Sequence, residues 1–152
     1  MNERPRIVLF QPDIPGNTGT ILRLAANLGM AVDIIEPAGF RLDDTALRRS
    51  GMDYLDRAAL QRHVDWNAFE EWRAGEKRRL ILLSTKASKS YTDFNFCSND
   101  CIIFGRESSG ATEAVHEAAD TELIIPMQES GRSLNIALSV AMVSGEALRQ
   151  LG

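Results

Sequence analysis

Short apolar runs alternate with helical patterns along most of the chain. The runs that predict strands are residues 7–10, 31–35, 80–83, 101–104 and 123–125, with a further short strand indicated near 58–60. None of the runs shows the clean alternation of apolar and polar positions that is typical of half-buried antiparallel strands. Strands buried on both faces and separated by helices favour a parallel sheet. The pattern therefore predicts an α/β fold with one mainly parallel sheet and helices on both faces.

Helical spacing follows most of these runs. The predicted helices cover residues 18–28, 41–49, the region around 66–72, residues 112–119 and the chain from 134 onward. Gly29 is placed as a C-terminal cap for the first helix. Trp66, Phe69 and Trp72 fall at helical spacing, and we interpret them as core residues rather than as a platform for stacking bases.

The stretch from Ile124 to the C-terminus contains a strand, a polar loop and a long helix. Pro126 has no N–H to donate, so the strand is expected to end there. Ser133 is a favourable N-cap residue for the helix. Asn135, in the first turn, either supports the cap or contacts a ligand, and the residues alone leave both interpretations open.

Composition limits the class of protein. A length of 152 residues with 44% hydrophobic content supports one core, so residues 1–152 are expected to form a single domain. The net charge of −4 gives no global sign of a nucleic-acid or membrane-surface protein, and a polyanion would have to meet local basic patches. No apolar run approaches the roughly 20 residues that span a bilayer, and the N-terminus lacks a signal-peptide pattern, so we expect a cytoplasmic protein.

The two cysteines, Cys97 and Cys101, do not indicate a metal site. They have no second pair and no histidine close in the sequence. We expect reduced thiols and no bound metal.

Three loops combine glycine, proline and polar residues, and each follows a predicted strand: residues 11–19, 105–110 and 126–133. Ligands of parallel sheets bind beyond the carboxyl ends of the strands. These loops are therefore the candidate site.

The first loop carries Asn17, Thr18 and Gly19, with Arg23 four residues beyond the glycine. Asn17 and Thr18 can cap the helix that follows. The Arg23 guanidinium suits phosphate or ribose oxygens, although a solvated surface arginine explains the same position.

The second loop, from Gly105 to Gly110, lacks the G-x-G-x-x-G pattern of dinucleotide sites and the Lys-Ser/Thr of a phosphate-binding P-loop. Its flanking glycines indicate a tight turn at the edge of the sheet. Glu107 would either meet a ligand there or cap the next helix.

Together the motifs resemble a known family. N-x-G-x3-R at 17–23, FGRESSG at 104–110, IPM at 125–127 and RSLN at 132–135 are similar to the three motifs of the SPOUT methyltransferases, in the SpoU branch that methylates ribose 2′-oxygens. The resemblance covers essentially the whole chain. With no separate RNA-binding domain expected, the chain looks most like the small TrmL-type tRNA enzymes of this branch, which methylate the wobble ribose.

The resemblance implies a C-terminal deep trefoil knot that holds S-adenosylmethionine, with S-adenosylhomocysteine as the product. The residues implied to bind the cofactor are Leu83, Gly105, Ile125, Met127, Ser133 and Leu134. It also implies tRNA as substrate, at a wobble cytidine or uridine, and a homodimer through the last helix. Ala137, Ala141 and Gly145 form a small-residue stripe that would let a partner helix approach, but packing within one subunit explains the stripe equally well.

The resemblance also implies roles for polar residues. Arg23 matches the arginine proposed to take the 2′-hydroxyl proton, yet a guanidinium with a pKa above about 12 is a poor base, so positioning a phosphate is the alternative. Asn17, Glu107, Ser133 and Asn135 are expected to hold Arg23, the ribose and the cofactor. A basic rim for RNA is expected from Arg41, Arg48, Arg49, Lys86 and Arg132.

Other functions stay open. One is a knotted RNA- or nucleotide-binding protein without catalysis, and another is a 2′-O-methyltransferase acting at a different RNA site. A phosphotransfer receiver would need an acidic cluster at a strand end, and the sequence shows none there.

Overall fold

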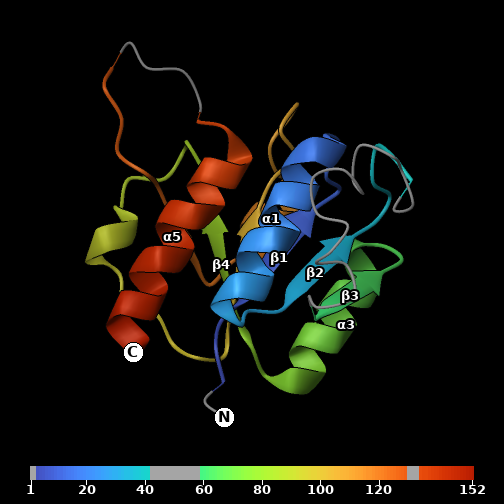
Figure 1. The fold of residues 1–152 in the computed structure, drawn as a ribbon, viewed down its shortest axis with the longest axis horizontal. Helices are drawn as coiled ribbons and strands as arrows, with labels where there is room; N and C mark the ends of the chain where they lie inside the picture. The colour runs from blue at the N-terminus through green and yellow to red at the C-terminus, as the bar shows by residue number, and fades with distance from the viewer. Residues whose placement is uncertain (1–2, 42–58, 130–133) are drawn as a thin grey trace.

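Six parallel strands form one sheet in the computed structural model, which describes residues 3–41, 59–129 and 134–152 (Figure 1). The strands are β1 (Arg6–Phe10), β2 (Val32–Ile35), β3 (Leu60–His63), β4 (Arg79–Leu83), β5 (Asp100–Phe104) and β6 (Thr121–Leu123). Their order is β3-β2-β1-β5-β4-β6, and each neighbouring pair is parallel. The predicted α/β class and parallel sheet are confirmed.

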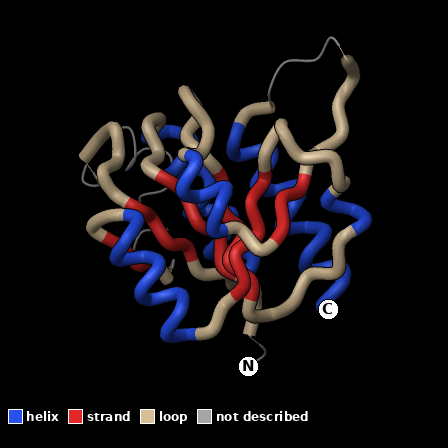
Figure 2. The backbone as a smooth tube through the Cα atoms, turned by 180° about the vertical axis from the view of Figure 1, so that it is seen from behind, coloured by secondary structure: helices blue, strands red, loops and turns tan. Residues whose placement is uncertain are grey.

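Helices cover both faces of this sheet. They are α1 (Pro15–Leu28), α3 (Trp66–Glu76), α4 (Glu113–Ala118) and α5 (Ile136–Leu151), with a short 3-10 helix η1 at Tyr91–Asp93. Helices α1 and α5 pack on one face, which is toward the viewer in Figure 1. Helices α3 and α4 pack on the opposite face, which is seen in Figure 2. Alternate residues of β1 enter the two cores: Ile7 and Leu9 on the α1 side, Val8 and Phe10 on the α3 side.

The first helix begins earlier than its pattern predicted. Pro15 occupies the first helical position and Ile14 is the N-cap, without a capping side chain. Proline suits this position because its φ angle is preset and its missing N–H would have no partner there. The prediction that Asn17 and Thr18 cap the helix is therefore wrong. The C-terminal cap at Gly29 is confirmed, with a φ of 66°.

The aromatic residues of α3 confirm their assignment to the core. Phe69 is fully buried, and Trp66 and Trp72 pack against the same cluster. Two strands differ from prediction by more than one residue at an end. Strand β3 lies at Leu60–His63 instead of 58–60, and β6 ends at Leu123 because its partner β4 ends at Leu83; Ile124 then bridges to Ser90.

The last helix begins at Ile136, and its N-cap is Asn135. The prediction of Ser133 as the N-cap is wrong. Ala137 is buried in the core, so packing within the subunit explains that part of the small-residue stripe. The large apolar residues that α5 exposes most are instead Leu138 and Met142, at 58% and 43%, followed by Leu151 at its C-terminal end, at 38%.

The predicted helix at 41–49 lies outside the described residues, apart from Arg41. Among the described helices, none is long and apolar enough to cross a bilayer.

Cys97 is exposed and Cys101 is buried, both as free thiols, and burial raises the pKa of Cys101 to about 12.

Candidate functional site

A cavity of about 640 Å³ opens at the carboxyl edge of the sheet. Loops after β1, β4, β5 and β6 line it together with the start of α5. The predicted site residues among its lining are Asn17, Leu83, Lys86, Gly105, Glu107, Ile125, Met127, Leu134 and Asn135. Its volume lies within the range of about 300–1,000 Å³ that is usual for small-molecule and cofactor sites. The fold thus brings the three sequence motifs to one place.

The loop after β5 is a closed turn. Arg106 N–H donates to the Gly110 carbonyl (3.0 Å), and Gly110 N–H donates back to the Arg106 carbonyl (2.8 Å). A Cβ on Gly105 would lie 2.5 Å from Ala111 N and from Gly110 C, so a side chain there would collide with backbone. The glycine therefore permits the turn that presents Glu107 to the cavity.

Asn135 caps the last helix, which is one of the two roles that the sequence left open, and its side chain also lines the cavity. Its Oδ1 accepts hydrogen bonds from Ala137 N (2.8 Å) and Leu138 N (3.4 Å), which caps α5. Its Nδ2 donates to Asn17 Oδ1 (3.1 Å), and both side chains line the cavity. The first turns of α1 and α5 are thereby joined at the site.

Two carboxyl groups meet beside the cavity. Asp13 N–H donates to Glu107 Oε2 (3.1 Å), and the Asp13 carboxylate accepts from Ser108 Oγ and faces Arg106 Nη2 at 3.6 Å. Burial raises the pKa of Glu107 above its usual range, and its hydrogen bond with Asp13 adds to this. The same hydrogen bond lowers the pKa of Asp13, helped by Ser108 and Arg106 and opposed by burial.

Sequence reasoning missed this acidic pair and found no acidic cluster at a strand end. Asp13 and Glu107 stand 94 positions apart and follow β1 and β5. These strands are neighbours only because the strand order reverses there, which is where open α/β sheets bind ligands. Asp13 did lie in a loop that the sequence had marked.

Other lining residues were also missed. Ser84 and Thr85 follow β4, and His116 of α4 faces the cavity with its Nδ1 2.8 Å from Glu122 Oε1. Apolar side chains around the opening remain uncovered: Ile14 is 45% exposed, and Met127 and Leu134 are each 39% exposed. An aromatic or aliphatic ligand group would cover that apolar surface.

Several predicted residues lie elsewhere. Arg23 is exposed on α1 and is not among the lining residues. It follows Asn17 by six positions, which places it about 9 Å further along the helix and on another face. Arg41 is described but does not line the cavity. Ser133, Arg48, Arg49 and Arg132 lie outside the described residues.

Comparisons with known proteins identify the family of this chain. The model of the SpoU rRNA Methylase family matches residues 4–145. The chain belongs to this family. A relative from Beijerinckia indica, named tRNA (cytidine(34)-2'-O)-methyltransferase, is 57% identical over 96% of this chain and 91% of its own length.

Solved structures agree with this assignment. One that describes the 2-OH methylation of C/U34 on tRNA has a TM-score of 0.92 at 37% identity, covering 98% of this chain and 97% of the other. The SpoU methyltransferase AviRb from Streptomyces viridochromogenes, in complex with the cofactor AdoMet, shares the fold with a TM-score of 0.91 at 24% identity. It covers 99% of this chain and 62% of the other.

Proposed function

We propose that this protein transfers a methyl group from S-adenosylmethionine to the ribose 2′-hydroxyl of tRNA, at the wobble cytidine or uridine. The observation that carries the proposal is the cavity at the carboxyl edge of the sheet, which is lined by residues of all three sequence motifs in a chain that belongs to the SpoU methylase family. The relative and the solved structure named for methylation at position 34 of tRNA, each aligned over nearly the whole chain, support the choice of substrate.

The lining fits the cofactor. Because Gly105 has no side chain, backbone alone forms the cavity wall there. The exposed apolar side chains of Met127 and Leu134 suit an adenine ring. Leu83, Gly105 and Ile125 end or follow strands, so their backbone polar groups face the cavity edge. When bound, S-adenosylmethionine supplies an electrophilic methyl group. Together with Ser133, these residues would hold the cofactor. The loop at residues 126–133 is expected to pass through the trefoil knot.

The chain's own polar groups would orient the substrate. Asn135 and Asn17 form a fixed pair at the cavity wall, suited to hydrogen bonds with ribose oxygens. Glu107 offers a carboxyl group in the lining of the same cavity. Arg23 would position a phosphate, since its guanidinium is a poor base. Lys86 at the cavity, with Arg41, Arg48, Arg49 and Arg132, would meet the RNA backbone.

The deciding experiment is methyl transfer from labelled S-adenosylmethionine to total tRNA from a strain lacking the gene, followed by mapping of the methylated ribose. Label at position 34 is expected. Cofactor binding without transfer would favour a non-catalytic RNA-binding protein, and methylation elsewhere would overturn the wobble assignment. In the same assay, Arg23→Ala should lower transfer and leave cofactor binding unchanged. A cytoplasmic location is expected because the substrate is tRNA.

The exposed face of α5 supports a homodimer. Leu138 and Met142 lie one turn apart on that helix, and a second copy of the chain would bury both. Leu138→Glu should convert a dimer to a monomer in sedimentation equilibrium. Val64→Glu is the matched control, because Val64 is 73% exposed between β3 and α3. A wild-type monomer, or a dimer that survives Leu138→Glu, would contradict this interface.

A further inference from the structure

Asp13 is enclosed by loops from three strands. It follows β1, and the loop after β5 contacts it through Ser108, Arg106 and Glu107. On its other side lies the loop after β2, where Gly39 N–H donates to the Pro12 carbonyl (2.8 Å). A Cβ on Gly39 would lie 2.8 Å from Asp13 Cβ, so only glycine allows this approach. The position of Asp13 is therefore closely defined.

Asp13 holds Glu107 in two ways. Its backbone N–H donates to Glu107 Oε2 (3.1 Å), which fixes one carboxyl oxygen. The two carboxyl groups also affect each other: beyond the effect of burial, the proximity of Asp13 raises the pKa of Glu107, and Glu107 lowers the pKa of Asp13. A proton on the pair relieves the repulsion between two neighbouring carboxylates.

Compensating charge near the pair is limited. Arg106 Nη2 is 3.6 Å from Asp13 Oδ2, and Ser108 supplies a neutral donor. Lys86 and His116 line the same cavity as Glu107, and His116 is engaged with Glu122. Among the described residues, Asp13 Oδ1 is buried without a hydrogen-bond partner. This arrangement disfavours two negative charges and leaves the proton with one of the two acids.

We propose that Asp13 is a positioning residue for the transfer reaction: it fixes the Glu107 carboxyl at the cavity wall and keeps a proton on the pair. This rests on the proposed function. Burial raises the pKa of Glu107 whereas the pKa of Asp13 is lowered, so Glu107 is the acid of the pair that takes up a proton first as pH falls. A protonated Glu107 donates a hydrogen bond to a substrate oxygen, and an ionised one only accepts. Asp13 thus sets the pH at which the site changes between these two states.

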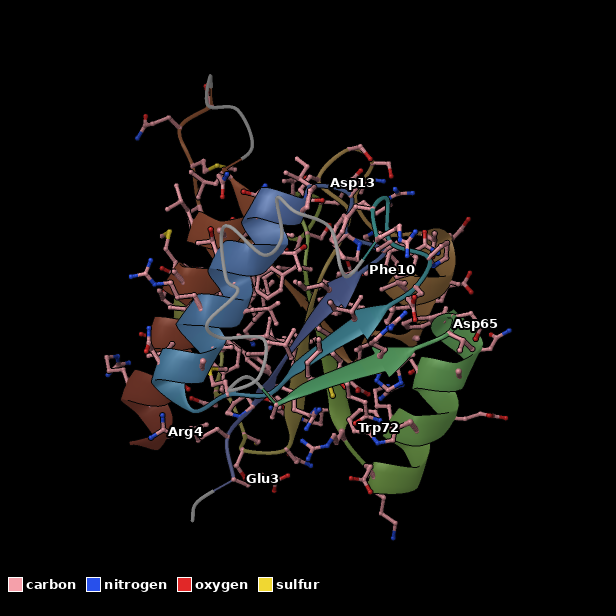
Figure 3. The ribbon with its side chains drawn as sticks, turned by 45° about the vertical axis from the view of Figure 1, so that its right-hand side comes forward. Glu3, Arg4, Phe10, Asp13, Asp65 and Trp72 are labelled. Carbon is pink, nitrogen blue, oxygen red and sulfur yellow. The ribbon has the colours of Figure 1, made fainter. Side chains whose placement is uncertain are left out.

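The test is Asp13→Asn, which keeps the size and removes the charge. Without that charge the pKa of Glu107 falls, so the alkaline limb of the kcat/KM profile, along which Glu107 loses its proton, should move to lower pH. Loss of the fixed geometry should lower kcat by about 10- to 100-fold, with cofactor affinity unchanged. Asp65→Asn is the matched control: Asp65 caps α3 apart from Asp13 (Figure 3), and asparagine caps equally well.

A second readout separates this inference from the proposed function. Carbon-13 NMR titration of the Glu107 carboxyl should show an elevated midpoint in the wild type and a lower one in Asp13→Asn, whether or not methyl transfer occurs. Ser108→Ala removes a donor that stabilises the Asp13 carboxylate, so the pair should hold its proton more strongly and the midpoint should move in the opposite direction; this variant serves if Asp13→Asn does not fold. A normal Glu107 midpoint in the wild type, or midpoint and kcat unchanged by Asp13→Asn, overturns the role of Asp13. Absence of transfer by the wild type would overturn only the function.

Discussion

The carboxylates of Asp33 and Glu107 have opposite surroundings in this protein. Asp33, in the middle of β2, is 0% exposed, and Arg6 binds it through Nε (2.6 Å) and Nη2 (3.1 Å). His63 Nε2 lies 2.8 Å from Asp33 Oδ1, the oxygen that Arg6 Nη2 also contacts. Glu107 instead has a second acid, Asp13, as its neighbour and faces a cavity. The first carboxylate is fully paired, whereas the second is not.

The surroundings explain the difference. Trp72 packs against the Asp33 group, with the Arg6 guanidinium 5.0 Å and the His63 ring 5.2 Å from its own ring (Figure 3). Arg6, Asp33 and His63 contact one another and Trp72, so this cluster presents no polar group to a ligand. At the carboxyl edge of the sheet, few positive charges balance the carboxyl groups of Asp13 and Glu107, and the loops leave a cavity. A perturbed and accessible carboxyl group marks a functional site, whereas a buried and paired one marks structure.

The largest effect is expected from Asp33→Asn. The substitution leaves Arg6, whose side chain is only 17% exposed, without its counter-charge, which should cost about 3 kcal/mol of unfolding free energy. Urea denaturation measures it. Glu36→Gln is the control, because Glu36 pairs with an Arg62 side chain that is 55% exposed, and its loss should cost no more than about 1 kcal/mol. Equal losses in the two variants would remove the distinction between buried and surface pairs.

Glu107→Gln should give the opposite pattern: methyl transfer falls by about 100-fold, equivalent to about 2.7 kcal/mol, without loss of stability. The pKa of Glu107 is raised in the folded state, so the wild type loses stability as pH rises through that value. Glutamine stays neutral. The melting temperature of the variant should therefore exceed that of the wild type at neutral pH, and the difference should vanish in acid. Destabilisation like that of Asp33→Asn would mean that Glu107 is structural.

The smallest effect is expected from Asn135, which both caps α5 and lines the cavity. Asn135→Ala removes the α5 cap and should cost about 1 kcal/mol in thermal or urea unfolding. Asn135→Ser retains a capping oxygen but loses the donor to Asn17, so its stability should stay near that of the wild type while transfer falls. If Asn135→Ser transfers methyl groups at the wild-type rate, the contact with Asn17 serves only folding.

The strands were the most predictable part of the fold, because the β1, β2, β4 and β5 runs are apolar on both faces. Helix starts were less predictable. Ser133 and Asn135 are both good cap residues, and the structure uses Asn135, which also contacts Asn17 on another helix. Likewise Pro15, and not the capping preference of Asn17, begins α1. Local preference could not decide between neighbours when a tertiary contact favoured one of them.

The sequence by itself determined the alternation of strands and helices, and therefore the edge where the three motif loops would gather. Only the tertiary structure decided which loops touch. The order of strands in a sheet depends on how both faces pack, and no local pattern encodes it. For that reason Asp13 and Glu107, 94 positions apart, become a pair. Asp33 is balanced in the same way, by Arg6 on β1 and His63 on β3.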